Sequence, residues 1–155
     1  MAKRPKIQWG PRTSPAVNAR RHLPQLAEGY FAEARDLLQE VSTPAGLHRL
    51  RLISKRLRYT LELFRACYPA GLSERIDALK SVQGLLGDIN DAVVAARLIQ
   101  HMPGSVRMRA HLDQLAARKA DEFRALWRNH FDAPGSESWW IDFLSSAALV
   151  RKTNG

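Results

Sequence analysis

The sequence predicts an all-α fold, an antiparallel four-helix bundle with a short C-terminal helical appendage. Apolar residues recur at steps of three and four in four long segments, as they do along one face of a helix. Proline and glycine separate these segments, and such short connections favour antiparallel neighbours. No useful length of apolar and polar alternation predicts a strand. At 155 residues, the chain suits one compact domain.

The first helix follows a basic arm. Residues 1–13 mix four cations with prolines and a glycine, so we expect them to be poorly ordered. Ser14 and Pro15 predict an N-cap and a first helical residue, and the helical pattern continues to about Val41. Pro24 lies inside this pattern, so we expect a kink there, or a restart of the helix after a short basic turn.

Three more long helices are expected, each after a serine or threonine that is suited to an N-cap. Ser42, Thr43 and Pro44 open the second helix, which runs to about Cys67. Ser73 is the N-cap candidate of the third helix, which reaches about His101, and Ser105 begins the fourth, which ends near Phe131. Met108, Leu112, Leu115, Phe123, Leu126 and His130 form the expected stripe of this last helix.

A break at residues 133–135 separates the bundle from an apolar segment, Trp139 to Val150, which is expected to pack across the bundle or to join a partner. The expected organisation is a basic flexible arm at 1–13, a helical bundle at 14–131, and a C-terminal segment and tail at 132–155.

Charge indicates the class of partner. The net charge is +9, and residues 1–66 hold 13 basic and 5 acidic residues, whereas residues 67–155 hold 11 and 10. Such a surplus attracts polyanions, which leaves nucleic acid, polyphosphate, acidic lipid headgroups and acidic proteins as candidates. No apolar run predicts a membrane span or a secretory signal. The single cysteine excludes an internal disulfide and an all-cysteine zinc site, and a reducing cytoplasm fits it best.

The densest part of this charge lies on one face of the second helix. At about 100° per residue, the apolar residues Leu50, Ile53, Leu57, Leu61 and Phe64 share one face. His48, Arg51, Lys55, Arg58 and Tyr59 share the opposite face, and Arg49 and Arg56 lie on a flank. A merely solvated face normally interleaves both signs of charge, but only Glu62 offsets the cations here. The pattern therefore favours a polyanion site, since arginine forks and lysine point charges both suit phosphate.

The third helix contains the segment Leu-Leu-Gly-Asp-Ile-Asn-Asp at residues 85–91. Glycine weakens a helix by about 1 kcal/mol relative to alanine, so we expect Gly84 and Gly87 to permit a close approach of helices. Asp88, Asn90 and Asp91 lack the spacing of a calcium loop. Structural roles, such as polar bonds to the basic helix, are expected for them instead of metal binding.

These two segments together resemble the CHAD (conserved histidine α-helical domain) family. The form His-x-x-Arg-x-x-x-Lys-x-x-Arg-Tyr-x-x-Glu is filled by His48, Arg51, Lys55, Arg58, Tyr59 and Glu62. A second element, Leu-Gly-x-x-Asn-Asp, is filled by Leu86, Gly87, Asn90 and Asp91. The match is strong over residues 44–98. The resemblance implies a helical bundle that binds inorganic polyphosphate without catalysis, in some members at polyphosphate or polyester granules.

The chain is shorter than the domain it resembles. A CHAD domain is expected to have two four-helix halves, each with a basic helix, and this sequence has room for one. The resemblance is closer to the second half. We therefore expect one half to work alone, or to form a homodimer in which two basic helices line one groove. The Trp139–Trp140 segment, expected to be exposed, is a candidate contact for that dimer.

The expected function is non-catalytic polyphosphate binding in the cytoplasm, without metal or cofactor. The expected binding residues are His48, Arg49, Arg51, Lys55, Arg56 and Arg58, with Arg20 and Arg21 widening the patch. If His48 contributes a proton, binding should strengthen at mildly acidic pH. The alternatives are non-specific nucleic-acid binding and a granule-associated scaffold. An enzyme is least favoured, because the sequence has no phosphate loop, nucleophile elbow or His/carboxylate metal signature.

Overall fold

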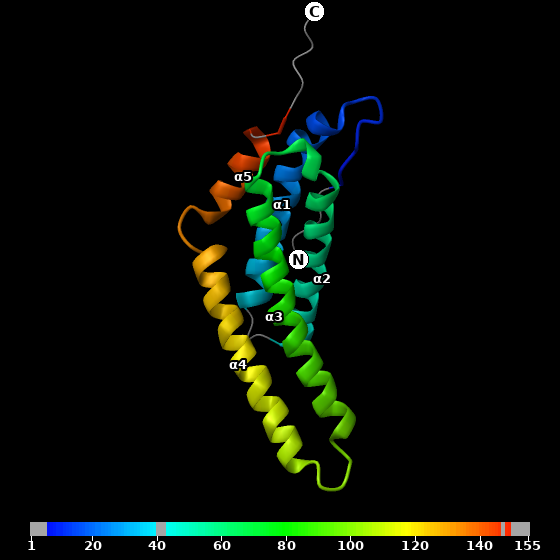
Figure 1. Cartoon of the computed structure of the whole chain (residues 1–155), viewed down its shortest axis with the longest axis vertical. Coiled ribbons are helices and arrows are strands. Elements are labelled where there is room, and N and C mark those ends of the chain that lie inside the picture. The colour runs from blue at the N-terminus through cyan, green and yellow to red at the C-terminus, as the bar shows by residue number, and fades with distance from the viewer. Residues whose placement is uncertain (1–5, 40–42, 147, 150–155) are drawn as a thin grey trace, which may run out of the picture.

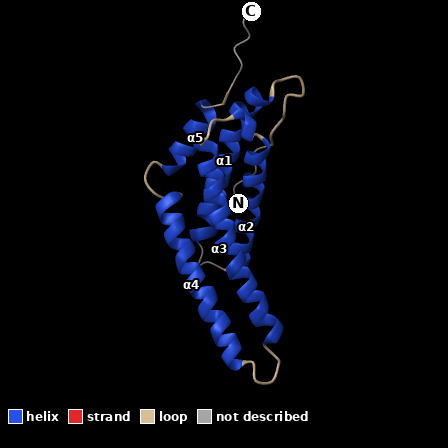
Figure 2. Ribbon diagram, in the orientation of Figure 1, coloured by secondary structure: helices blue, strands red, loops and turns tan. Residues whose placement is uncertain are grey.

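The computed structural model describes residues 6–39, 43–146 and 148–149, and these contain helices and loops but no strand. The all-α class is therefore confirmed (Figures 1 and 2). The elements are α1 (Pro15–Gln39), α2 (Pro44–Leu63), the 3₁₀ turn η1 (Arg65–Cys67), α3 (Gly71–Ile99), α4 (Val106–His130) and α5 (Ser136–Ser146).

Neighbouring helices run antiparallel. Tyr30 of α1 hydrogen-bonds Ser54 of α2, while Glu33, further along α1, pairs with the earlier residue Arg49. Helix α4 packs along α3, and α5 packs along α1. The distal ends of α3 and α4 project beyond the ends of α1 and α2 as a two-helix hairpin (Figure 1). At one end of the molecule several helices therefore pack together, whereas the other end consists of the α3–α4 hairpin alone.

Helix α1 is continuous from Pro15 to Gln39, so the restart expected at Pro24 does not occur. The Ser14 hydroxyl accepts a hydrogen bond from the amide of Val17, as the expected N-cap does. Proline cannot bond the carbonyl four residues earlier, yet the packing of α1 on both α2 and α5 keeps the helix intact.

The start of α2 agrees with the punctuation, whereas Ser105 precedes α4 without a side-chain capping bond. The hydroxyl of Thr43 caps α2 by accepting from the amide of Gly46, and Pro44 follows it. Helix α2 ends at Leu63, before the expected Cys67, and the 3₁₀ turn takes up the remainder. Helix α3 begins at Gly71, so Ser73 lies inside the helix and accepts from the Arg65 guanidinium instead of capping.

An aromatic cluster joins α1, α4 and α5. Phe31 of α1 contacts Phe131 and Trp140 with ring centroids about 6 Å apart, and Trp127 stacks on Phe131 at 4.6 Å. Tyr30 contacts the same two rings of the α4 end. Such pairs add to the free energy gained from burial. They fix the C-terminal turns of α4 against α1.

The N-terminal arm is held more firmly than its composition predicts. The Asn18 side chain donates to the carbonyls of Gly10 and Thr13 and accepts from the Gly10 amide. The Trp9 ring stacks on Phe64 at 5.4 Å and meets His22 edge-on at 5.1 Å. Residues 6–13 therefore lie on the tips of α1 and α2, and residues 1–5 lie outside the described part.

Helix α5 corrects the expectation of an exposed tryptophan pair. Trp140 is 1 % exposed, whereas Trp139 is 49 % exposed. The Arg75 guanidinium lies 3.4 Å from the Trp139 ring and 3.8 Å from the Phe143 ring, and it donates to the Trp139 carbonyl. Trp140 is buried because it completes the aromatic cluster, so it offers no surface to a dimer.

The expected apolar stripe of α4 is only partly buried. Within α4 the buried residues are Phe123 and Trp127, and Met108 is 56 % exposed. The reason is the projecting hairpin, where α4 meets α3 alone (Figure 1). Near its tip, Leu98 and Val106 are exposed as well. In the part of the chain that is described, no helix is long and apolar enough to cross a membrane.

Candidate functional site

Helix α2 presents its cations to solvent because its apolar face is buried. Leu50, Ile53, Leu57 and Leu61 lie in the core. On the other side, His48, Lys55, Arg56 and Tyr59 are exposed, and Arg51 and Arg58 are partly buried at the edge. Five cations and no carboxylate occur among the eleven residues from His48 to Arg58. This solvent-facing row, with Tyr59 and the flanking Arg49, is the α2 face.

The edge of the α2 face borders α3. His48 and Asn90 line one small cleft, and the nearest side-chain atom to a Cβ built on Gly87 is Arg51 Nε, at 3.6 Å. Arg51 Nε is buried and has no hydrogen-bond partner within the described chain. Its buried stem limits the rotamers that the guanidinium can adopt, so less entropy is lost when it binds an anion.

The Tyr59 ring contacts the two cations in the C-terminal half of the row. The Arg58 guanidinium carbon lies 4.5 Å from the Tyr59 ring centroid, and Lys55 Nζ lies 5.6 Å from it. Arg58 also donates to Glu62, at 3.3 Å. The ring and the carboxylate hold these two cations in place without neutralising Lys55. An anion reaching Arg58 must share it with Glu62.

The two flanking arginines differ. Arg49 is held by Glu33 of α1, with its Nε and Nη2 atoms 2.8 and 2.7 Å from the same carboxylate oxygen. Arg56 is exposed, and no described carboxylate lies within ion-pair distance of it. An open groove of about 500 Å³ runs beside Arg56. It is lined by Leu52, Lys55, Arg56, Tyr59, Thr60 and Leu63. Arg56 is therefore the more available of the pair.

Arg20 and Arg21 lie on α1, near the end of α2. Both are exposed, but they precede His22, which Trp9 places at the level of Phe64. That level is about 24 Å from His48 but only about 9 Å from Arg58 along the helix axis. Arg20 lies eleven residues before Phe31 and so on the side of α1 that meets α5. The expected widening of the patch by these two arginines therefore stays a prediction.

The roles expected for the third helix hold only in part. A Cβ added at Gly84 would meet nothing within 4 Å, so no close helix approach explains this glycine. Asp88 lies toward α4, with its carboxylate 4.0 Å from Lys119 Nζ, and not toward the basic helix. Asp91 is exposed. Only Gly87 and Asn90 lie at the edge of α2.

Two residues of α3 extend the row and were not predicted. The contacts of His48 with the Asn90 cleft and of Arg51 with Gly87 define an antiparallel register. Continuing it places Gln83 level with Lys55 and Lys80 level with Arg58. Lys80 is exposed and only 3.9 Å from Asp77, a weak surface pair. Sequence spacing alone could not find them, because the register between helices is a tertiary property.

Among the described residues, no group of three His, Cys, Asp or Glu side chains is arranged to hold a metal ion. Burial raises the pKa of the Cys67 thiol, so it stays protonated near neutral pH.

Comparison with known proteins agrees with the geometry of α2 and α3. The family model described as the CHAD domain matches residues 3–100, which cover the arm and helices α1 to α3. No curated protein and no solved structure gives a match. The matched range is more than half of the chain and includes every residue of the α2 face. The chain therefore belongs to the CHAD family.

Proposed function

We propose that this protein binds inorganic polyphosphate on the α2 face, without catalysing a reaction. The observation that carries the proposal is the group of five cations, with no carboxylate among them, in the segment from His48 to Arg58, on a helix whose apolar side is buried. A row of one sign opposes its own helix unless a polyanion compensates it. Membership of the CHAD family, to which polyphosphate binding is attributed, supports the same ligand.

The surroundings of each cation determine the contact that it would make with polyphosphate. Arg51 and Arg58, held at the edge of α3, would each grip phosphate oxygens with a planar fork, while Lys55 acts as a mobile point charge between them. His48 and Arg56 would assist from the two sides. Lys80 and Gln83 of α3 would donate to the same chain. Arg49, already bound by Glu33, would contribute least.

The unit of binding is the bundle of residues 14–131, with the C-terminal segment as its appendage. We propose that this half-length CHAD domain acts alone or pairs with a second copy across two basic helices. In the pair, the groove beside Leu52 and Leu63 would be closed by the partner. We propose a cytoplasmic location, including the surface of polyphosphate or polyester granules.

Nucleic-acid binding is the second candidate, because duplex DNA also attracts a basic helix. Tyr59 is the one aromatic residue within the row, and Arg58 stacks on its ring. Its ring is therefore less free to stack on a base. We expect DNA binding to be weak and non-specific.

A competition titration separates the two candidates. Long-chain polyphosphate, added at physiological salt to the protein bound to fluorescent duplex DNA, should displace the DNA at an equal or lower concentration of negative charge. Affinity for polyphosphate should also grow with chain length and fall steeply with salt. Displacement of polyphosphate by DNA would reverse this ranking.

A further inference from the structure

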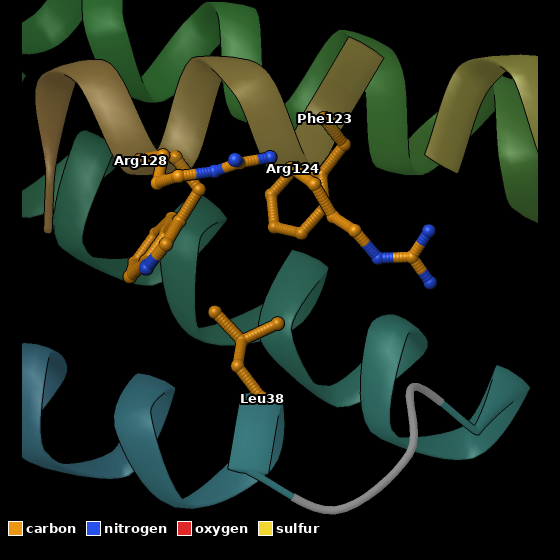
Figure 3. Close-up of a pocket in the computed structure, with 5 residues that line it drawn as sticks. Leu38, Phe123, Arg124 and Arg128 are labelled. Carbon is orange, nitrogen blue, oxygen red and sulfur yellow. The ribbon is translucent and has the colours of Figure 1, made fainter. Parts of the chain in front are cut away.

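A pocket on the far side of the core combines an apolar floor with two cations. It lies between the C-terminal turn of α1 and the C-terminal half of α4, and it shares no residue with the α2 face. Leu38, Phe123, Arg124, Trp127 and Arg128 line it. In Figure 3, Leu38 points from α1 toward the α4 side chains, and Arg124 extends to one side of the opening.

Among the described residues, the charges at this opening are only partly balanced. Arg124 pairs with the exposed Asp121 of its own helix at 3.1 Å, a contact of small value. Within the described residues, no carboxylate lies within ion-pair distance of Arg128. Two like charges four residues apart on a helix repel each other. An anion between the two guanidinium groups would relieve that repulsion.

The apolar side chains at the floor of the pocket favour a ligand that has an apolar part. The buried residues Phe123 and Trp127 line the pocket, and Leu38 is half-buried. The pocket is open to solvent on one side and holds about 200 Å³, which is room for one aromatic ring. A phosphate chain would leave the apolar floor uncovered, whereas an aromatic ring would fill it. The shape and charge together therefore suit a small molecule with both parts.

We propose that this pocket binds small aromatic monoanions, with the ring on Leu38, Phe123 and Trp127 and the anionic group between Arg124 and Arg128. It is a second site, independent of the polyphosphate function proposed for α2. A ligand of this size that stays partly in solvent has an expected Kd of roughly 1 mM.

Phenylacetate is a suitable probe, read by ¹H–¹⁵N NMR of the tryptophan indole groups. The chain has four tryptophans, so the spectrum has four indole signals, and Trp127→Phe identifies the relevant one. Phenylacetate should shift the Trp127 signal in a saturable way and leave those of Trp9 and Trp139 in place. No Trp127 shift up to several times the expected Kd would overturn the proposal.

Ligand controls test the two halves of the site. Acetate, which lacks the ring, and benzyl alcohol, which lacks the charge, should each bind at least about threefold more weakly than phenylacetate. Benzyl alcohol binding as tightly as phenylacetate would overturn the role of the arginines.

Variants test the same roles from the side of the protein. Arg128→Gln should weaken phenylacetate by about threefold to tenfold, while Arg56→Gln on α2 should leave it unchanged. Equal effects of the two variants would indicate general attraction to a basic protein and would contradict a specific pocket.

A competition experiment tests the independence of the two sites. Binding of phenylacetate that persists in excess polyphosphate would support it, and competition between the two ligands would refute it.

Discussion

The cations of α2 and the cation of Arg75 occupy opposite surroundings in one small bundle. On α2, the row from His48 to Arg58 faces solvent and includes no carboxylate. Arg75 of α3 is 2 % exposed, stacks between Trp139 and Phe143, and donates to two backbone carbonyls. Burial lowers its pKa to about 10, so it is still charged at neutral pH.

We expect the exposed cations of α2 to contribute to ligand binding and the buried Arg75 to contribute to stability. The guanidinium of Arg75 is buried and stacked, and both of its terminal nitrogens bond backbone carbonyls, so it joins helices and is not accessible to a ligand. Exposed cations such as Lys55 and Arg56, which have no carboxylate partner among the described residues, stabilise little and keep their donors for an anion. The same residue type should therefore give two opposite mutational results in this protein.

The largest effect is expected from removing three cations of the row. The triple change Arg51→Ala, Lys55→Ala and Arg58→Ala should weaken polyphosphate binding at least about 100-fold, because several charge-assisted hydrogen bonds are lost together. Isothermal titration calorimetry measures this, and thermal unfolding should change little.

A matched triple change controls for net charge. Arg97→Ala, Arg107→Ala and Arg118→Ala remove the same three charges from exposed positions of the α3–α4 hairpin. We expect affinity to fall only a few-fold, through the weaker long-range field. Equal losses in the two triple variants would show that net charge, not the α2 face, binds the ligand.

Arg75→Ala should give the reverse result. Loss of two hydrogen bonds and of the stacking on Trp139 and Phe143 should lower the free energy of unfolding by about 3 kcal/mol. Urea unfolding measures this change. Polyphosphate affinity of the folded variant should stay within about twofold of the parent. A large loss of polyphosphate affinity with unchanged stability would show that Arg75 contributes to binding, which contradicts the prediction.

A smaller loss of stability is expected from a change at Tyr30, which contacts the buried side of α2. Tyr30 is buried and hydrogen-bonded to Ser54 at 2.9 Å, so Tyr30→Phe should cost about 1 kcal/mol of unfolding free energy and leave binding unchanged. Burial raises the pKa of Tyr30, and also that of Tyr68. The unfolded phenols ionise near pH 10 and the folded ones resist, so stability should fall as pH rises above about 10.

Denaturant unfolding of both proteins across this alkaline range checks the linkage. Tyr30→Phe should lose less stability per pH unit than the parent. Equal slopes in the two proteins would mean that the Tyr30 phenol does not cause the alkaline loss.

The smallest effect is expected at Arg49. Because Glu33 already binds its guanidinium, Arg49→Gln should change polyphosphate affinity by no more than about twofold. The exposed Arg56, changed to Gln, is the matched comparison and should lose more. A greater loss at Arg49 would indicate that the ligand displaces Glu33.

Sequence periodicity predicted the helices and the α2 face, because both depend on spacing along one segment. The Thr43 cap and the buried positions of α2 follow from local chemistry. Contacts between segments were harder to predict. The approach expected at Gly84 and the exposure expected for Trp140 were wrong, since each depends on which helix lies opposite. Lys80 and Gln83 became visible only with the register between α2 and α3.

A crystal structure with a short polyphosphate chain tests the central claim most directly. The account predicts successive phosphates along α2 from His48 to Arg58, with Arg51 and Arg58 bound to phosphate oxygens and Lys80 near the end of the chain. Phosphates along α4, or at Arg20 and Arg21, with the α2 face empty, would contradict it.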